Sequence, residues 1–420
     1  MRRRRLARAA LLLALATTPT TALQLSSAAA AAARRASLAA AAATSTAAAA
    51  AAPPPGALNV TTVPVTTPAL TVALAAPPPR GIFDPSLLAT GNASLPYVLA
   101  YSAVTATDNI STLLALYSTE VDAWVGVAAV NAADVGVPLP CGGGGSCIGS
   151  FVHEVSSLVV DPADADPARA FKVFTHSYVV TNGSQLHYDW GHIRLWTAPS
   201  LAGPWAGAPL LGWASPSPLS TAGVALNLTS VAELADCVLF TEPGALLLGA
   251  SLVLALGCVS TAPQPGGAGH IRVVSLASAD HGATWAYAGL LVDGADALAL
   301  GYAVPQLNAA ALFAATPAGG ELLLSVTPAA LLAPGFTGYC GCLVLRVLGD
   351  GAGGLRVARD PDTGVPVVER AVVPSSAASF AGACAAAASA YAPAVGGFML
   401  PTLLEAAWEF AILPSWQPPP

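Results

Sequence analysis

The sequence of 420 residues is short of charge, of lysine and of aromatic side chains. Charged residues make up 9% of the chain and aromatic residues 6%, whereas 55% of the residues are hydrophobic. Lys172 is the only lysine. This composition excludes global disorder, which requires low hydrophobicity and high charge. The length is sufficient for one large domain or two ordinary ones, each with its own core.

Basic residues are scarce beyond the N-terminus. Seven of the 16 basic residues lie at or before Arg35, so the rest of the chain carries nine basic groups against 23 acidic ones. Because the affinity of proteins for nucleic acid rests on neutralising phosphates, we expect no nucleic-acid partner.

Long uncharged segments are also few. The best candidate for a membrane span, PGALLLGASLVLALGCV at residues 243–259, has 17 residues, which is the lower limit for a spanning helix. The LGAS sequence in its middle is typical of a turn between two apolar strands. We therefore predict a β-hairpin here and no transmembrane span.

The seven cysteines lack the paired CxxC spacing of zinc sites, and we expect neither a metal nor a cofactor. In an oxidising compartment, Cys141 and Cys147 would close the CGGGGSC loop, and Cys237 would meet Cys258 across a hairpin. The alternative for the other cysteines is burial as small hydrophobic side chains.

No acidic residue precedes Asp84, and the N-terminus combines a basic start with an apolar stretch at residues 9–16. This pattern predicts a signal peptide at residues 1–22, with a plastid transit peptide as the alternative. An Ala/Pro-rich, low-complexity linker follows at 23–57, then a folded domain at 58–414 and a tail at 415–420.

Asparagines favour the secretory alternative. Five of the seven have Ser or Thr two places on, where chance would give about one. These are Asn59, Asn92, Asn109, Asn182 and Asn227. We expect a glycosylated protein that is secreted or lies in the lumen of the secretory pathway.

A short pattern repeats along the folded part. IRLWTAPSLAGPW (193–205) and IRVVSLASADHGATW (271–285) each contain an alternating strand, a small polar turn and a tryptophan that opens the next strand; LLALYSTEVDAW (113–124) is a weaker copy. With two earlier strands around each copy, the chain divides into units of four. The predicted strands are 83–88, 97–104, 113–119 and 124–130; 151–160, 171–180, 193–197 and one after Trp205; 238–248, 252–259, 271–276 and 285–291; and one near Tyr302, then 322–326, 343–348 and 355–358.

Four-stranded units of this spacing are typical of propeller blades. A fifth unit begins at 391–401, and its missing strand would come from residues 58–74, which closes the ring and removes exposed sheet edges. We predict an all-β fold, a five-bladed β-propeller of four-stranded antiparallel blades. A six-bladed, sialidase-like propeller and a two-sheet sandwich are the alternatives.

One motif has the spacing Ser278-x-Asp280-x-Gly282-x-x-Trp285. It resembles the Asp-box of sialidase-type propellers, and the resemblance implies a structural role on the rim: the aspartate caps backbone N–H groups, glycine takes a positive φ and tryptophan packs between sheets.

Three predicted first strands carry a carboxylate in apolar surroundings: Asp84 in GIFDPSLL, Glu154 in FVHEVSSLVVDP and Glu242 in FTEPGALL. A buried lone carboxylate is costly, so three that converge on a central funnel predict an acid–base site. Asp161 and Asp236 are the alternatives to Glu154 and Glu242.

This arrangement resembles the five-bladed propeller glycosidases of the arabinanase, xylosidase and invertase families, which place one acid on each of the first three blades. The resemblance implies that Asp84 is the general base or nucleophile, that Glu154 tunes pKa and orients the sugar, and that Glu242 is the general acid. Four rings, His153, His176, Tyr178 and Trp190, are candidates for stacking on the sugar, with ordinary core packing as the alternative.

These residues predict a secreted or lumenal glycoside hydrolase that acts as a monomer on a carbohydrate. A non-catalytic propeller that binds glycans or proteins is the alternative. A sialidase is disfavoured, because the three arginines that such enzymes use to bind the substrate carboxylate are not recognisable.

Overall fold

The computed structural model describes residues 60–63, 69–70, 81–90, 92–95, 97–104, 110–120, 123–141, 145–181, 185–214, 217–261, 271–314, 321–333, 336–339, 342–349, 354–374, 399–404 and 407–412. The expected signal peptide, linker and tail lie outside these residues, as do Asn59, Asn109 and Asn182 of the predicted glycosylation sites. In the ranges given, no helix combines the length and hydropathy needed to cross a membrane.

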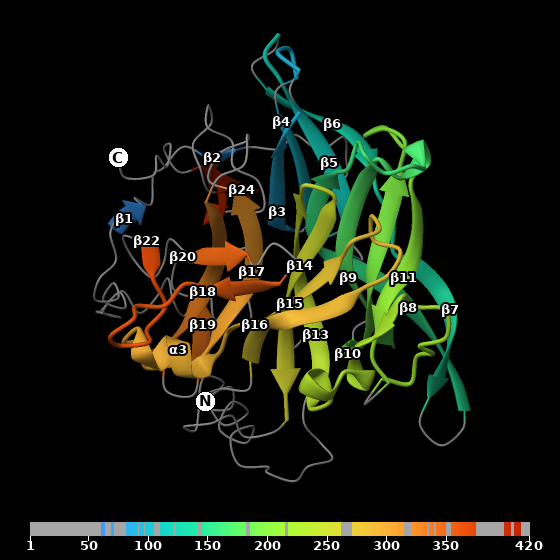
Figure 1. The fold of residues 1–420 in the computed structure, drawn as a ribbon. Helices are drawn as coiled ribbons and strands as arrows, with labels where there is room; N and C mark the ends of the chain where they lie inside the picture. The colour runs from blue at the N-terminus through green and yellow to red at the C-terminus, as the bar shows by residue number, and fades with distance from the viewer. Residues whose placement is uncertain are drawn as a thin grey trace, which may run out of the picture.

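The described strands form five sheets, which we call blades 1 to 5 in chain order, and Figure 1 shows them following one another around the molecule. Blade 1 has the order β3 (Gly81–Ala89), β4 (Tyr97–Val104), β5 (Ile110–Ser118) and β6 (Ala123–Ala129). Blade 3 has the order β13 (Cys237–Leu248), β14 (Ser251–Ser260), β15 (Ile271–Ser278) and β16 (Ala286–Val292). Both are antiparallel.

Blades 2 and 4 are larger. Blade 2 contains β8 (Gly145–Val160), β9 (Phe171–Thr181), β10 (Gln185–Ala198) and β11 (Ala206–Gly212), with β7 (Asp134–Cys141) beside β8 and β12 (Leu226–Asn227) beside β11. Blade 4 contains β17 (Leu307–Ala314), β18 (Leu322–Ala333), β20 (Cys342–Gly349) and β22 (Val368–Pro374), with β19 (Phe336–Tyr339) and β21 (Leu355–Val357) as additions. The capped helix α3 (Gly294–Ala299) leads into it.

The first two described strands pair with strands of the last two blades. In blade 5, β2 (Ala69–Leu70) pairs with β24 (Ala407–Ile412), which pairs with β23 (Met399–Leu404). A second N-terminal strand, β1 (Val60–Val63), lies parallel to β22 at the outer edge of blade 4. The prediction of an all-β, five-bladed propeller closed by the N-terminal segment is confirmed.

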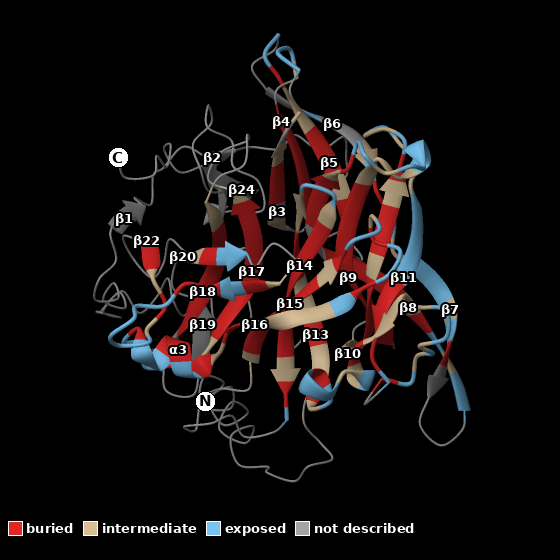
Figure 2. Cartoon of the chain, viewed as in Figure 1, coloured by how far each residue is buried: buried red, intermediate tan, exposed pale blue. Residues whose placement is uncertain are grey.

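The core consists of the interfaces between blades. In β14, Leu252 and Leu254 pack in the cluster shared with blade 2, while Val253 and Ala255 pack in the cluster shared with blade 4. Successive side chains of a strand point to opposite faces, so a strand covered on both faces must be apolar throughout. This explains why β14 is a continuous hydrophobic segment, and Figure 2 shows burial concentrated in such strands.

The first strands of the blades are also tied to one another. Ser86 Oγ in β3 accepts a hydrogen bond from Leu158 N in β8 at 2.9 Å, and Ser157 Oγ in β8 accepts one from Ala245 N in β13 at 2.8 Å. A serine hydroxyl therefore connects the first strand of blade 1 to that of blade 2, and another connects blade 2 to blade 3 in the same way.

Two local predictions are confirmed. Residues 243–259 form a hairpin in which Leu248 pairs with Ser251, and Cys237 and Cys258 form a disulfide between β13 and β14. Cys147 is disulfide-bonded as well, and so is Cys342.

Two details of the strand prediction are wrong. The fourth strand of blade 4 is β22 rather than residues 355–358, because β20 pairs along Cys342–Leu345 with β22 and only its end pairs with β21. Strand β7 was not predicted, because its glycine and two prolines are typical of a loop; it lies at the edge of blade 2, where proline is tolerated.

Candidate active site

The first strands of blades 1 to 4 each contain a β-bulge. The pairing is interrupted between Phe83 and Ser86, between Glu154 and Ser157, between Thr241 and Gly244, and between Asn308 and Ala311. The residue after the first of each pair is therefore equivalent around the ring. Asp84 occupies this position in blade 1, Val155 in blade 2, Glu242 in blade 3 and Ala309 in blade 4.

Three of these equivalent residues have left-handed backbone conformations. The φ angles are 51° for Asp84, 57° for Glu242 and 50° for Ala309. For a residue other than glycine such a conformation costs about 1–3 kcal/mol, and it persists where the surrounding structure enforces it. Because Ala309 shares it, the bulge belongs to the architecture. The feature that distinguishes blades 1 and 3 is the carboxylate placed on it.

Glu242 lies where blades 3 and 4 meet. Its half-buried side chain accepts, through Oε2, a hydrogen bond from Ala309 N, the backbone of the next bulge. Two residues further along, a Cβ added to Gly244 would lie 2.3 Å from Ala310 O, so the two strands pass too closely for a side chain. The carboxylate of Glu242 is thus held by the neighbouring blade.

Glu154 is placed differently, one residue before the position that Asp84 and Glu242 occupy. It is buried, and Tyr178 Oη donates a hydrogen bond to its Oε2 at 3.0 Å. Glu154 lies opposite His176 in the ladder between β8 and β9. Glu154, His176 and Tyr178 therefore share one face of blade 2.

His176 connects this face to blade 3. Its Nδ1 lies 3.2 Å from Thr241 Oγ1, and its ring centroid is 5.0 Å from that of Tyr178. Thr241 immediately precedes Glu242. The structure thus brings Glu154, Tyr178 and His176 close to the bulge that carries the third carboxylate.

His153 and Trp190 lie on the opposite face. His153 Nδ1 is 2.7 Å from Ser177 Oγ, and its ring packs edge-on against Trp196. Burial, with the positive charge of Arg194, lowers the pKa of His153 to about 3. Trp190 stacks on His187 with ring centroids 4.0 Å apart and packs against the cluster that contains Phe151. The four rings expected to share a cleft are therefore divided between two faces, which the alternation of His153 and Glu154 in one strand already indicates.

The two alternative carboxylates are engaged in ion pairs. Arg272 binds both carboxylate oxygens of Asp236, and hydrogen bonds from this guanidinium hold the pKa of Asp236 well below its usual value. Asp161 is fully buried. Burial raises its pKa, but hydrogen bonds from Lys172 Nζ at 2.9 Å and from His281 at 2.9 Å hold it below the usual value. Asp236 thus connects the start of blade 3 to β15, and Asp161 connects blade 2 to the turn that contains His281.

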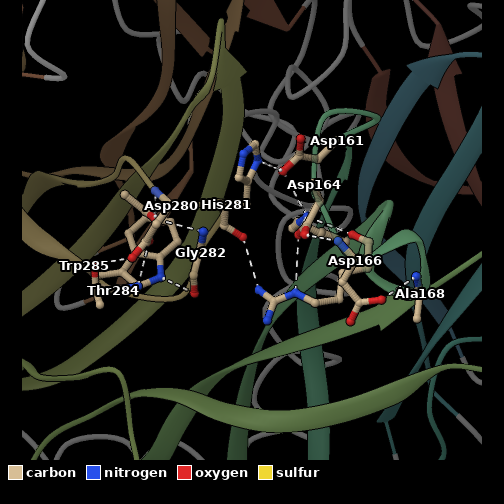
Figure 3. Close-up of polar contacts among 12 residues, drawn as sticks. Asp161, Asp164, Asp166, Ala168, Asp280, His281, Gly282, Thr284 and Trp285 are labelled. Atoms are coloured by element: carbon tan, nitrogen blue, oxygen red, sulfur yellow. Dashed lines mark hydrogen bonds and ion pairs between the residues drawn. The ribbon is translucent and has the colours of Figure 1, made fainter.

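The turn from Ser278 to Trp285, which connects β15 to β16, combines hydrogen bonds within the turn with contacts of His281 to Asp161 and Arg169 of blade 2 (Figure 3). Asp280 Oδ1 accepts hydrogen bonds from Ser278 Oγ and Thr284 N, both at 2.8 Å. The Thr284 hydroxyl also donates to Asp280 Oδ2, and the hydrogen bonds from the hydroxyl and N–H of Thr284 lower the pKa of Asp280 to about 2. Gly282 has a φ of 91°, and Trp285 Nε1 donates to Gly282 O.

One group among the described residues has the composition of a metal site: Asp161, Asp164 and His281 bring ligand atoms within 4.8 Å of one another. However, Lys172 Nζ lies 2.9 Å from Asp161 Oδ2 and 2.7 Å from Asp164 Oδ2. Arg169 Nε lies 3.3 Å from Asp164 Oδ2 as well, so two cationic side chains already face the two carboxylates, and we assign the cluster to the contact between blades 2 and 3.

Three residues near the carboxylates were not identified in the sequence: Thr241, Ala309 and Trp213. Trp213 Nε1 donates to Asp189 O at 2.8 Å, and its ring lies between His176 and Phe240. Threonine and alanine in a strand carry no local signal. Asp84 and Glu242 are each followed by proline, which favours an extended conformation of the preceding residue, so the left-handed backbone had no signal in the sequence.

No family model matches the chain, and no curated protein matches it. Solved structures that are similar in part include the following three. The Cellvibrio cellulosa α-L-arabinanase is 13% identical, with 69% of this chain and 80% of that chain covered and a TM-score of 0.39. The Schwanniomyces occidentalis fructofuranosidase complexed with fructose is 10% identical over 70% and 50%, with a TM-score of 0.41. The catalytic domain of the Coprinopsis cinerea α-L-arabinofuranosidase is 10% identical over 83% and 96%, with a TM-score of 0.44. At these values, the fold assignment rests on the strand pairings described above.

Proposed function

We propose that this chain is a secreted or lumenal glycoside hydrolase with Asp84, Glu154 and Glu242 as its acidic residues. The observation that supports this most is the placement of Asp84 and Glu242 on equivalent left-handed bulges of two inner strands. A carboxylate on such a bulge is positioned by the backbone itself, which suits a group that must meet a reacting atom.

In the proposed reaction, Glu242 protonates the leaving glycosidic oxygen as the general acid. Asp84 acts from the other side of the sugar, as the base that activates water or as the nucleophile. Glu154 tunes their pKa values and orients the sugar, with one of its oxygens fixed by Tyr178 Oη. The Ser278–Trp285 turn has a structural role only.

The first test is hydrolysis of arabinofuranosides, xylosides, fructosides and galactosides by the wild-type protein and by Asp84→Asn and Glu242→Gln. We expect each substitution to lower kcat by about 10²- to 10⁴-fold on the glycoside that is cleaved, since each removes one proton-transfer or nucleophilic group. Glu120→Gln is the matched control, because Glu120 is exposed on the turn after β5. It should leave kcat unchanged.

A second measurement separates the enzyme from the binding propeller. Isothermal titration with the corresponding oligosaccharides should show that Glu242→Gln still binds, since the substitution removes proton donation and little else. Binding without hydrolysis in the wild-type protein would favour the non-catalytic alternative. Equal loss of activity in Glu120→Gln and Glu242→Gln would refute the assignment of Glu242.

A further inference from the structure

His176 lies fully buried between blades 2 and 3, with a contact at each ring nitrogen. Nε2 is 3.1 Å from Tyr188 O, and Nδ1 is 3.2 Å from Thr241 Oγ1. A carbonyl oxygen can only accept, so Nε2 carries the proton and donates to it. Nδ1 then has a free lone pair, and the Thr241 hydroxyl donates to it. Burial lowers the pKa of His176 to about 3, so this neutral tautomer is maintained at neutral pH.

The irregular part of β10 between His187 and Gly191 contacts the ring of His176. In β10 the pairing with β9 is interrupted between His187 and Gly191, and His176 and Trp213 donate hydrogen bonds to two carbonyls of that bulge, those of Tyr188 and Asp189. A Cβ on Gly191 would lie 2.7 Å from Ser177 O and 3.1 Å from His176 Nε2. The backbone of Gly191 therefore lies close to the imidazole, and a side chain at this position would collide with Ser177 O.

Aromatic rings extend this arrangement into blade 3. The ring centroids of Tyr178 and His176 are 5.0 Å apart, those of His176 and Trp213 are 6.1 Å apart, and those of Trp213 and Phe240 are 5.4 Å apart. Phe240 is followed by Thr241 and then by Glu242. Because the protein interior has little free volume, a shift of one packed ring displaces the rings beside it.

Glu242 requires such support. Its left-handed backbone is unfavourable for a glutamate and persists only under constraint from neighbours. On one side, the carboxylate accepts from Ala309 N of blade 4. On the other side, the residue before Glu242 is held by His176 of blade 2.

We propose that His176 is a positioning residue for Glu242, acting through the hydroxyl of Thr241, and does not itself contact the sugar. The role in catalysis rests on the proposed function. The structural part, that this contact holds the bulge, does not. The positioning role differs from the expectation that His176 stacks on the substrate. Both ring nitrogens of His176 have hydrogen-bond partners within the protein, and the ring is buried.

Thr241→Val tests the proposal with little change in shape, because it removes the hydroxyl that donates to His176. The matched control is Thr175→Val. Thr175 is the residue before His176 in β9, its hydroxyl is buried as well, and it contacts Ser177 and Trp196 on the opposite face. His176→Gln is the second variant, which keeps a donor for Tyr188 O.

Crystal structures of the wild type and these variants give a readout that needs no activity. In Thr241→Val the backbone of Glu242 should leave the left-handed region and its carboxylate should move away from Ala309 N, whereas in Thr175→Val both should stay. An unmoved Glu242 carboxylate in Thr241→Val would overturn the inference, whatever the activity. If the carboxylate moves but the wild type cleaves no glycoside, the proposed function fails and the positioning role stands.

Kinetics provide the second readout. Thr241→Val should lower kcat by about ten- to a hundred-fold with KM changed by less than about three-fold, because a displaced acid misses the leaving oxygen while the sugar still binds. His176→Gln should retain more activity than His176→Ala. A rise in KM at constant kcat would show that Thr241 and His176 act in sugar binding and would overturn the proposal, as would equal losses in Thr241→Val and Thr175→Val.

Discussion

Lys172, the only lysine of the sequence, is entirely buried. Its Nζ contacts Asp161 Oδ2 at 2.9 Å, Asp164 Oδ2 at 2.7 Å and Arg169 O at 2.7 Å, so all three protons of the ammonium have an acceptor. Asp161 is also hydrogen-bonded to His281 of the Ser278–Trp285 turn. Lys172 and Arg169, whose Nε lies 3.3 Å from Asp164 Oδ2, therefore place two positive charges against two carboxylates at a contact between blades 2 and 3.

We expect Lys172→Met to lower the free energy of unfolding by about 3–5 kcal/mol, because it removes the ammonium group from the buried Asp161 carboxylate and leaves Asp164 with Arg169 alone. Arg356→Met is the control, since Arg356 is exposed on β21 and its loss should cost less than about 0.5 kcal/mol. Urea denaturation measures both. A Lys172→Met protein as stable as the wild type would show that the cluster contributes nothing.

At the scale of the element, blade 2 concentrates buried histidines on β8, β9 and β10. Burial lowers the pKa of His153 and of His176 to about 3, and it lowers the pKa of His187 and His192 as well. In the unfolded chain these groups titrate near pH 6.5. Between these pH values the unfolded state binds more protons than the folded state, so acid favours unfolding.

Stability should therefore fall as the pH is lowered below about 6.5, by up to about 1.4 kcal/mol per pH unit for each of His153 and His176. Denaturation at pH 6.5, 6.0, 5.5 and 5.0 measures this slope above the range in which the paired carboxylates begin to protonate. His153→Phe keeps an aromatic ring and should reduce the slope by about one proton. An unchanged slope would mean that His153 is charged in the folded state or stays neutral in the unfolded one.

At the scale of the whole molecule, the ring is closed by the N-terminal segment. Strand β2 supplies the outer strand of blade 5, and β1 covers the outer edge of blade 4. Closure removes sheet edges that would otherwise expose unpaired backbone groups. The stability of these two blades thus depends on residues that lie far from them in the sequence.

A chain that begins at Pro79 lacks both strands and should unfold at a lower temperature than one that begins at Leu58, which retains them. Calorimetry of the two proteins measures the difference. We also expect blades 4 and 5 of the shorter chain to exchange their amide protons first, since their edges are exposed. Identical melting of the two chains would show that the ring does not need this closure.

How much of this the sequence determined depends on the range of the interaction concerned. Alternating residues and turn signals are local, and they were sufficient for the strands of blades 1 and 3, for the hairpin at Gly249 and for the Cys237–Cys258 pair. Residues 355–358 and β22 both combine apolar residues with charged ones in a short segment, and only the ladder with β20 distinguishes them. The same limit applies to β7, whose prolines are acceptable only because it lies at an edge.

The candidate site divides in the same way. Scarcity of charge made Asp84, Glu154 and Glu242 conspicuous in their apolar strands. The tertiary structure alone decided that Asp84 and Glu242 stand on equivalent bulges, that Glu154 is offset by one residue, and that His176 reaches Thr241. Pairing register and contacts between blades join residues distant in sequence, so no local pattern contains them. The sequence specifies the type of each side chain, but the packing of the sheets determines which side chains it contacts.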